Sequence, residues 1–228
     1  ANDIRFHEND QQLVLFSEMD DEKDEQKIVL NVSNFILEDF IPFAFKDPKI
    51  EGTLTGLITV TDPLGKSIVE FLGRADSLKI ENEQIGSISL QSNFNLEKEE
   101  LTFQTQNIDT VNIFTANGKF RYKDSVNSIE ARLTGKKIQL GIIEPYLTDI
   151  FDEFNGNASA SLQIAGNQKH QVLKGEVNID SAALKLEVTQ CKYNLKKQKV
   201  VFSEDAIEFP YLQLTDSLNN TATLNGKI

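Results

Sequence analysis

The sequence predicts an all-β protein with two short helices, arranged as an elongated, meandering antiparallel sheet built from about two tandem repeats. Three observations lead to this prediction: apolar and polar residues alternate with a period of two, helical spacing occurs in only two short segments, and the second half of the chain repeats the order of the first. Period-two alternation places apolar side chains on one face of a strand. Repeats that bury their faces against neighbours build elongated bodies.

Strands are predicted wherever the alternation is regular. In the segment 53–61 the residues Leu54, Gly56, Ile58 and Val60 share one face, and four threonines lie on the other with Leu57. The segment 157–165 follows the same scheme, with small and aliphatic residues inward and amides and serines outward. Turn residues, among them Asn117-Gly118, separate many of the predicted strands. The inward aliphatic positions that we take as candidate site residues are Leu54, Ile58, Val60, Leu162, Ile164, Val177, Ile179, Leu184, Leu186, Leu212 and Leu214.

Only the segments 37–45 and 140–151 have helical spacing, with apolar residues recurring at three and four positions. Each contains a proline, Pro42 or Pro145, near its first turn, where a missing amide is tolerated best. Helices of about two turns are not stable alone. We therefore expect both to pack on the sheet.

An internal repeat relates the two halves of the chain at offsets of 103 to 108 residues. The sequence divides into the tail of a preceding repeat (1–27) and two units (28–128 and 129–228), which form one continuous elongated domain. Each unit is predicted to contain a strand, a short helix and a meander of about five or six strands. The matching residues are Leu30 with Leu133, Leu37 with Leu140, Pro42 with Pro145, Gly52 with Gly156, Ile58 with Leu162, Val60 with Ile164, Asp76-Ser77 with Asp180-Ser181, and Asn117-Gly118 with Asn225-Gly226.

Composition excludes several classes of function. The net charge of −12 and the absence of a dense run of Lys and Arg argue against binding to nucleic acid. No apolar run is long enough to span a membrane, and no signal peptide is recognisable. We therefore expect membrane contact only through parts absent from this chain. A single cysteine, Cys191, allows no internal disulfide.

No catalytic residues, metal site or cofactor can be nominated, so we do not expect an enzyme. The chain has two histidines, His7 and His170, far apart in sequence, and no metal-binding or nucleophile motif.

Asp followed by Ser or Thr and an aliphatic residue occurs five times. These triplets suit turn chemistry, since Asp and Ser bond to their own backbone. They also resemble acceptors for O-linked glycans on exported proteins of some two-membrane bacteria. The triplets begin at Asp76, Asp109, Asp124, Asp180 and Asp216.

The apolar face of the predicted sheet has two interpretations. It is either the inner face of an ordinary sandwich with a filled core, or the lining of a curved, open trough that shelters acyl chains. Alternation alone does not distinguish them. A trough would leave an apolar surface far larger than soluble monomers normally expose.

The order of these motifs resembles the TamB family of translocation and assembly modules, which is related more distantly to AsmA-like proteins. The resemblance covers essentially all 228 residues. Its elements are a helix of the form Leu-x-x-x-x-Pro-aromatic (37–43 and 140–146), an alternating strand that begins with Gly (52–60 and 156–164), a Gly-x-Ala/Val segment followed by Asp-Ser (73–77 and 175–181), and a closing Asn-Gly-Lys strand (225–228).

The resemblance implies a strongly curved, groove-like sheet of the β-taco type in an envelope protein. Such a protein is anchored in the inner membrane by an N-terminal helix and crosses the periplasm. It transfers phospholipid between the inner and outer membranes in outer-membrane biogenesis. Its partner is an outer-membrane β-barrel assembly protein of the TamA type. Of these properties only the lipid-binding groove maps onto this chain, at the eleven inward positions named above.

Two other functions compete with a lipid conduit. The strand edges could pair with nascent outer-membrane β-barrel proteins as an assembly scaffold, or the chain could be a purely structural β-spacer. The scaffold predicts binding of extended peptides and indifference to lipid, whereas the spacer predicts neither binding activity.

Overall fold

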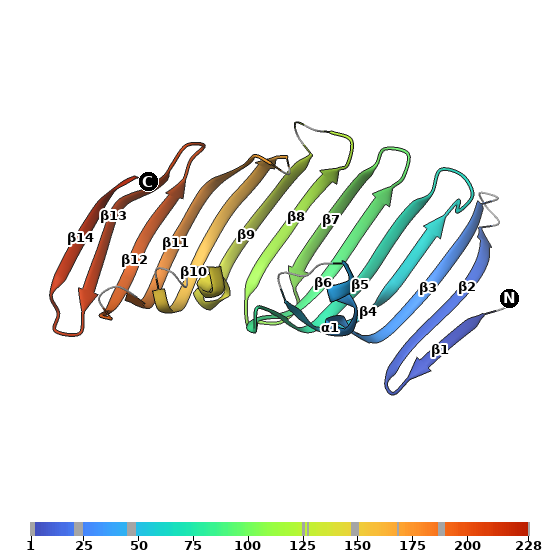
Figure 1. The fold of residues 1–228 in the computed structure, drawn as a ribbon, viewed down its shortest axis with the longest axis horizontal. Helices are drawn as coiled ribbons and strands as arrows, with labels where there is room; N and C mark the ends of the chain where they lie inside the picture. The colour runs from blue at the N-terminus through green and yellow to red at the C-terminus, as the bar shows by residue number, and fades with distance from the viewer. Residues whose placement is uncertain are drawn as a thin grey trace.

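The computed structural model is a single open antiparallel sheet of fourteen strands, in which each strand pairs with its neighbours in sequence (Figure 1). The structure describes residues 3–20, 25–44, 49–124, 126, 128–146, 151–167, 169–186 and 190–227. The strands are β1 (Ile4–Glu8), β2 (Gln11–Asp20), β3 (Glu25–Ile36), β4 (Ile50–Thr61), β5 (Ile68–Ile80), β6 (Glu83–Asn95), β7 (Glu100–Asn107), β8 (Ile113–Arg121), β9 (Ile129–Gln139), β10 (Phe151–Gly166), β11 (Gln171–Leu186), β12 (Lys192–Phe202), β13 (Ile207–Asp216) and β14 (Thr221–Lys227).

Two short helices lie against the same end of the strands, along the lower edge of the sheet in Figure 1. The first, α1 (Leu37–Ala44), is an α-helix. The second, η1 (Leu140–Tyr146), is a 3₁₀-helix. Of the predicted helical segment 140–151, residues 147–150 lie outside the described residues, and Phe151 belongs to β10. Gly141 and Pro145 give this segment low helix propensity, which fits a single tight turn.

No second layer covers the sheet among the described residues, so the filled-sandwich interpretation is wrong. The chain has an accessible surface of 14652 Å². A compact monomer of 25.6 kDa would expose about 10,400 Å². The larger accessible surface is expected for a single curved, groove-like sheet, because no second sheet covers either face of its described strands.

A line of β-bulges bends successive strands near the two helices. Register shifts occur between Val32 and Phe35, between Glu51 and Thr53, between Ala75 and Leu78, and between Asn157 and Ala158. Asn34, Ser77, Gly52 and Gly156 have positive φ at or beside these shifts. Each bulge bends its strand and increases the local twist. The matching Asp-Ser pairs of the internal repeat, Asp76-Ser77 and Asp180-Ser181, therefore lie where their strands bend.

The turn predicted at Asn117-Gly118 is wrong, because both residues lie in the middle of β8. Gly118 is required there by a close approach: a Cβ atom at this position would come within 2.8 Å of the Phe103 ring on β7. The ring of Phe103 therefore occupies the space that a side chain would fill.

The elements occur in the same order twice. β3, α1 and β4 to β8 are followed by β9, η1 and β10 to β14. Each set is one strand, one short helix and five strands. The boundaries of the proposed repeat units, 28–128 and 129–228, stay a prediction.

Candidate functional site

All eleven candidate residues lie on one face of the sheet, which we call the apolar face. Directly paired residues of antiparallel strands share a face, so the face can be followed from strand to strand. One row of paired residues crosses thirteen strands, β1 to β13: Leu13, Val32, Gly56, Gly73, Leu90, Thr105, Ala116, Leu133, Leu162, Gly175 and Phe202, with Phe6 at one end and Ile207 at the other.

The candidate residues fall into two groups by their surroundings. Ile179 and Leu184 are buried in a cluster around Leu140 of η1, and Leu54 packs against a second cluster around Leu37 of α1. The remaining members of the first group border the η1 cluster: Val177, Leu186, Leu212 and Leu214. The second group is half-buried and belongs to neither cluster: Ile58, Val60, Leu162 and Ile164.

The helices close one side of the apolar face, which we call the helix-covered rim. Leu37 packs with Ala75, Leu78 and Ile85, and Leu140 packs with Phe154 and five other buried residues of β10 to β12. Because these clusters fill the space beneath the helices, the accessible part of the apolar face lies toward the opposite strand ends, the helix-free rim.

The helix-free side of the apolar face contains large side chains that the sequence-based list of candidates missed. A paired row crosses seven adjacent strands without a polar residue: Ile28, Val60, Val69, Phe94, Leu101, Phe120 and Ile129. All seven are half-buried. A sequence signal for this row exists in β7, where Leu101 and Phe103 alternate with Thr102 and Gln104.

Glycines let aromatic rings lie flat against the sheet on this face. The Phe71 ring covers the paired Gly56 and Gly73, where added Cβ atoms would come within 2.8 and 2.6 Å of it. Phe103 covers Gly118 in the same way. These rings occupy the space that side chains would fill at the three glycine positions.

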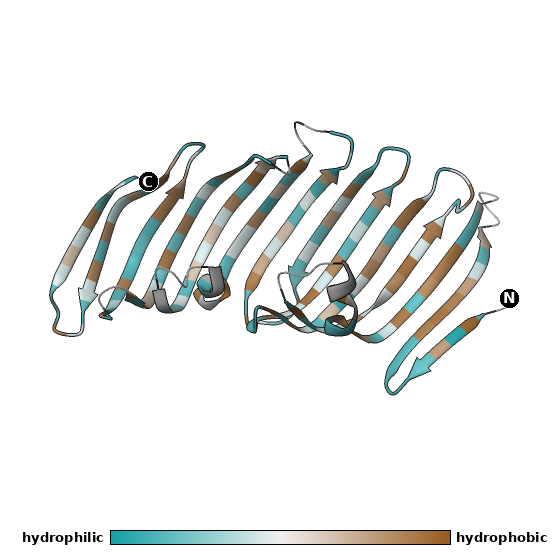
Figure 2. Ribbon diagram, viewed as in Figure 1, coloured by the Kyte–Doolittle hydropathy of each residue, from teal (hydrophilic) through white to brown (hydrophobic). Residues whose placement is uncertain are grey.

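The charged groups are concentrated on the other face. Lys119 pairs with Glu130 at 2.9 Å and Arg121 pairs with Glu100 at 2.8 Å. A side-chain hydrogen bond with Lys199 lowers the pKa of Glu176. Figure 2 shows the resulting alternation of hydrophilic and hydrophobic residues along the strands.

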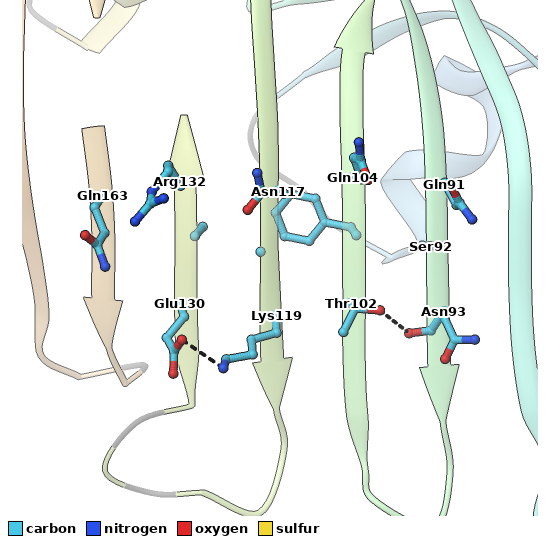
Figure 3. Close-up of a pocket in the computed structure, with 13 residues that line it drawn as sticks. Gln91, Ser92, Asn93, Thr102, Gln104, Asn117, Lys119, Glu130, Arg132 and Gln163 are labelled. Atoms are coloured by element: carbon cyan, nitrogen blue, oxygen red, sulfur yellow. Dashed lines mark hydrogen bonds and ion pairs between the residues drawn. The ribbon is translucent and has the colours of Figure 1, made fainter. Parts of the chain in front are cut away.

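A cavity of about 540 Å³ lies on this polar face (Figure 3). It is an open channel between two rows of side chains, one crossing β6 to β10 and the other β6 to β9. One row is Gln91, Gln104, Asn117, Arg132 and Gln163, and the other is Asn93, Thr102, Lys119 and Glu130. Amides and charges line it, so it does not suit an acyl chain.

A smaller cavity of about 410 Å³ lies beside α1 at the N-terminal end of the sheet. Phe6, Leu13 and Phe35 of the apolar face line it together with Asp39 of the helix. It extends the apolar face toward the edge strand β1.

The Asp triplets are explained in part by local hydrogen bonds. Asp109, Asp124 and Asp216 each accept a bond from the backbone N–H two residues later, which is the Asx-turn geometry.

In the part of the chain that the structure describes, no group of three or more His, Cys, Asp and Glu side chains could hold a metal ion. No helix there is long and apolar enough to cross a bilayer. No protein-family model, curated protein or solved structure matches the chain. The resemblance to the TamB family thus stays a prediction.

Proposed function

We propose that this chain is a non-enzymatic lipid conduit whose apolar face shelters acyl chains. The observation that supports it is the continuous, half-buried apolar row on the helix-free side, which no second layer covers in the described residues. Sheltering an acyl chain there removes both partners from water, at about 0.8 kcal/mol per CH₂ group. Since the row has no polar interruption over seven strands, a chain can slide along it without a large barrier.

The biological setting that we propose follows from the resemblance to the TamB family. The chain would be a periplasmic segment of an inner-membrane-anchored protein that transfers phospholipid between the two membranes in outer-membrane biogenesis. A TamA-type partner would contact regions outside this chain.

A paired substitution tests the conduit. Ile58→Asp with Leu162→Asp places two charges on the open part of the apolar face, and we expect at least a tenfold loss of affinity for a naturally fluorescent fatty acid. The chain has no Trp, so its own fluorescence interferes little. The matched control is Leu57→Asp, because Leu57 is 40% exposed on the opposite face. Retained binding in the double variant, with an unchanged far-UV spectrum, would exclude the conduit, as would an equal loss in the control.

A second candidate, an assembly scaffold, is favoured by the two open sheet edges. β1 and β14 each pair on one side only, and all seven residues of β14 are exposed. An extended peptide could add to β14 by backbone hydrogen bonds. Successive backbone amides of a strand point to opposite sides, so one of the amides at positions 223 and 224 faces away from β13. The single variants Thr223→Pro and Leu224→Pro remove these two amides one at a time. If neither substitution reduces the binding of an extended peptide, the scaffold is excluded, and if fatty acid does not bind either, a structural spacer remains.

A further inference from the structure

Exposed apolar side chains occupy the tips of three adjacent turns on the helix-free rim. Leu64, in the turn between β4 and β5, is 95% exposed. Leu96 lies in the turn between β6 and β7, and Tyr122 and Val126 lie between β8 and β9, with exposures of 50, 60 and 66%. We call these four side chains the rim tips. The three turns that carry them lie along the upper edge of the sheet in Figure 1.

Hydrogen bonds hold these turns in place and to one another. In the first turn the Gly65 amide donates to the Asp62 carbonyl at 3.1 Å, which leaves Leu64 at the apex. The Leu96 amide donates to the Ser67 carbonyl at 3.0 Å, and the Tyr122 amide donates to the Glu99 carbonyl at 3.0 Å. Neighbouring turns are therefore joined through their backbones. The rim tips are presented on a preorganised surface, which reduces the entropy lost on docking.

The rim tips continue the apolar face rather than forming a separate patch. Tyr122 makes edge-to-face contacts with Phe94 and Phe120, at centroid distances of 5.7 and 4.6 Å. Both phenylalanines belong to the uninterrupted apolar row beneath the turns. Apolar surface therefore extends from the face of the sheet to Tyr122. On the helix-covered rim, the exposed Ile113 pairs with Lys137, Ile108 lies in the connection between β7 and β8, and Leu218 lies in the turn between β13 and β14.

The three turns that carry the rim tips have little net charge, because 62–67, 96–99 and 122–128 together contain four acidic and three basic side chains. The turn 203–206, on the same rim, adds Glu204 and Asp205. Two of the lysines pair with neighbouring acids: Lys66 lies 2.6 Å from Glu97, and Lys123 contacts Glu99. Hydrogen bonding to Glu97 raises the pKa of Lys66. Turns of low net charge with protruding Leu and Val and an amphipathic Tyr suit a bilayer interface, where Tyr is enriched and lysines can remain in water.

We propose that the helix-free rim docks on a lipid bilayer and inserts Leu64, Leu96, Tyr122 and Val126 into its interface. Lipid then enters the apolar face sideways over Tyr122, whose ring contacts Phe94 and Phe120 of the apolar row. Lateral entry rests on the proposed conduit, whereas docking itself does not. This inference departs from the expectation that only parts absent from the chain contact a membrane.

Single-tryptophan reporters test docking directly, because the chain has no tryptophan. With vesicles of phosphatidylcholine, Leu64→Trp should show a blue-shifted emission and quenching by brominated acyl chains. The control is Leu218→Trp, since Leu218 is 79% exposed in a turn of the opposite rim. It should show neither effect. An unshifted Leu64→Trp, or equal shifts at both positions, would overturn the proposal.

Flotation with the same vesicles gives the affinity. Leu64→Asp with Leu96→Asp should reduce vesicle binding about tenfold or more, whereas Leu218→Asp should not. An equal mixture of phosphatidylcholine and phosphatidylglycerol should bind more weakly, because the chain has a net charge of −12. Binding to the anionic mixture alone would contradict docking through apolar side chains, because the tip-bearing turns carry no excess of basic residues.

The two proposals fail in different ways. Ile58→Asp with Leu162→Asp should abolish fatty-acid binding and leave vesicle binding intact. The rim variant should do the reverse. If the rim variant binds vesicles as well as the unchanged protein, docking is excluded and the conduit is unaffected.

Discussion

The two rims of the sheet are built from the same alternating strands but differ in what covers them. At the helix-covered rim, α1 and η1 fold over the apolar face and bury Leu78, Ile85, Phe154 and Leu184. At the helix-free rim the apolar row from Ile28 to Ile129 stays half-buried. Both rims carry large apolar side chains, so composition does not distinguish them.

The difference in coverage means that the two rims of the sheet contribute differently to the protein. The helix-covered rim holds the two buried clusters, where most of the packing free energy is gained. The helix-free rim gains less from packing and keeps a surface that a ligand can reach. A single sheet can therefore be stable while one side of it stays open.

The largest expected effect is on the free energy of unfolding, when a leucine is truncated to alanine under the helices and, separately, on the open part of the apolar face. Leu184→Ala removes a side chain that is 6% exposed in the η1 cluster, and we expect a loss of about 2–5 kcal/mol in the free energy of unfolding. Leu162→Ala, on the open part of the same face, should lose about 1 kcal/mol, because less of its surface leaves water on folding. Urea denaturation measures both. Equal losses would show that the open side is packed as tightly as the covered side.

A smaller effect is expected at the bulges. Gly156 has a φ of 143°, and an added Cβ would collide with the Ser181 carbonyl and come within 2.7 Å of Ala182 Cα. Gly156→Ala should therefore destabilise the protein by about 1–3 kcal/mol. Gly226→Ala is the control, because nothing lies within 4 Å of its added Cβ. A stability equal to that of the control would mean that the bend at the helix-covered rim does not depend on this backbone conformation.

The smallest effect concerns the turn between β13 and β14. Hydrogen bonding, mainly from the Asn220 side chain, lowers the pKa of Asp216 below its ordinary value of 3.8. A lowered pKa means that the ionised group stabilises the folded state above pH 3.8 and that this contribution is lost as the pH falls through the folded-state value. Asp216→Ala should thus lower the Tm slightly at neutral pH. The difference from the unchanged protein should vanish in acid, and a difference that persists there would contradict this origin.

Much of the fold was predictable from the sequence. Alternation in 53–61 and 157–165 identified β4 and β10 and correctly placed Leu54, Ile58, Leu162 and Ile164 on one face. The helix at Leu37 was also predicted correctly. The 3₁₀ form of η1 was not, because spacing alone does not set the hydrogen-bond pattern of a turn so short.

The candidate site was predicted in part. The sequence placed all eleven aliphatic positions on the apolar face, but it missed Phe94, Leu101 and Phe120, which make the open side continuous. Asn117-Gly118 was wrongly predicted to be a turn. The glycine is there because of a contact with Phe103 on the neighbouring strand, and such a contact leaves no signal in the local sequence.

The sequence by itself determined that one face of every strand would be apolar, because a period of two acts within a single strand. Only the tertiary structure decided what that face meets. Bulges at residues such as Ser77 and Gly156 bend the strands beside the helices, and no second sheet is stacked over the rest of the described chain. Coverage depends on contacts between segments that are distant in sequence, whereas alternation reports only on neighbours, and for this reason the open rim became visible only in three dimensions.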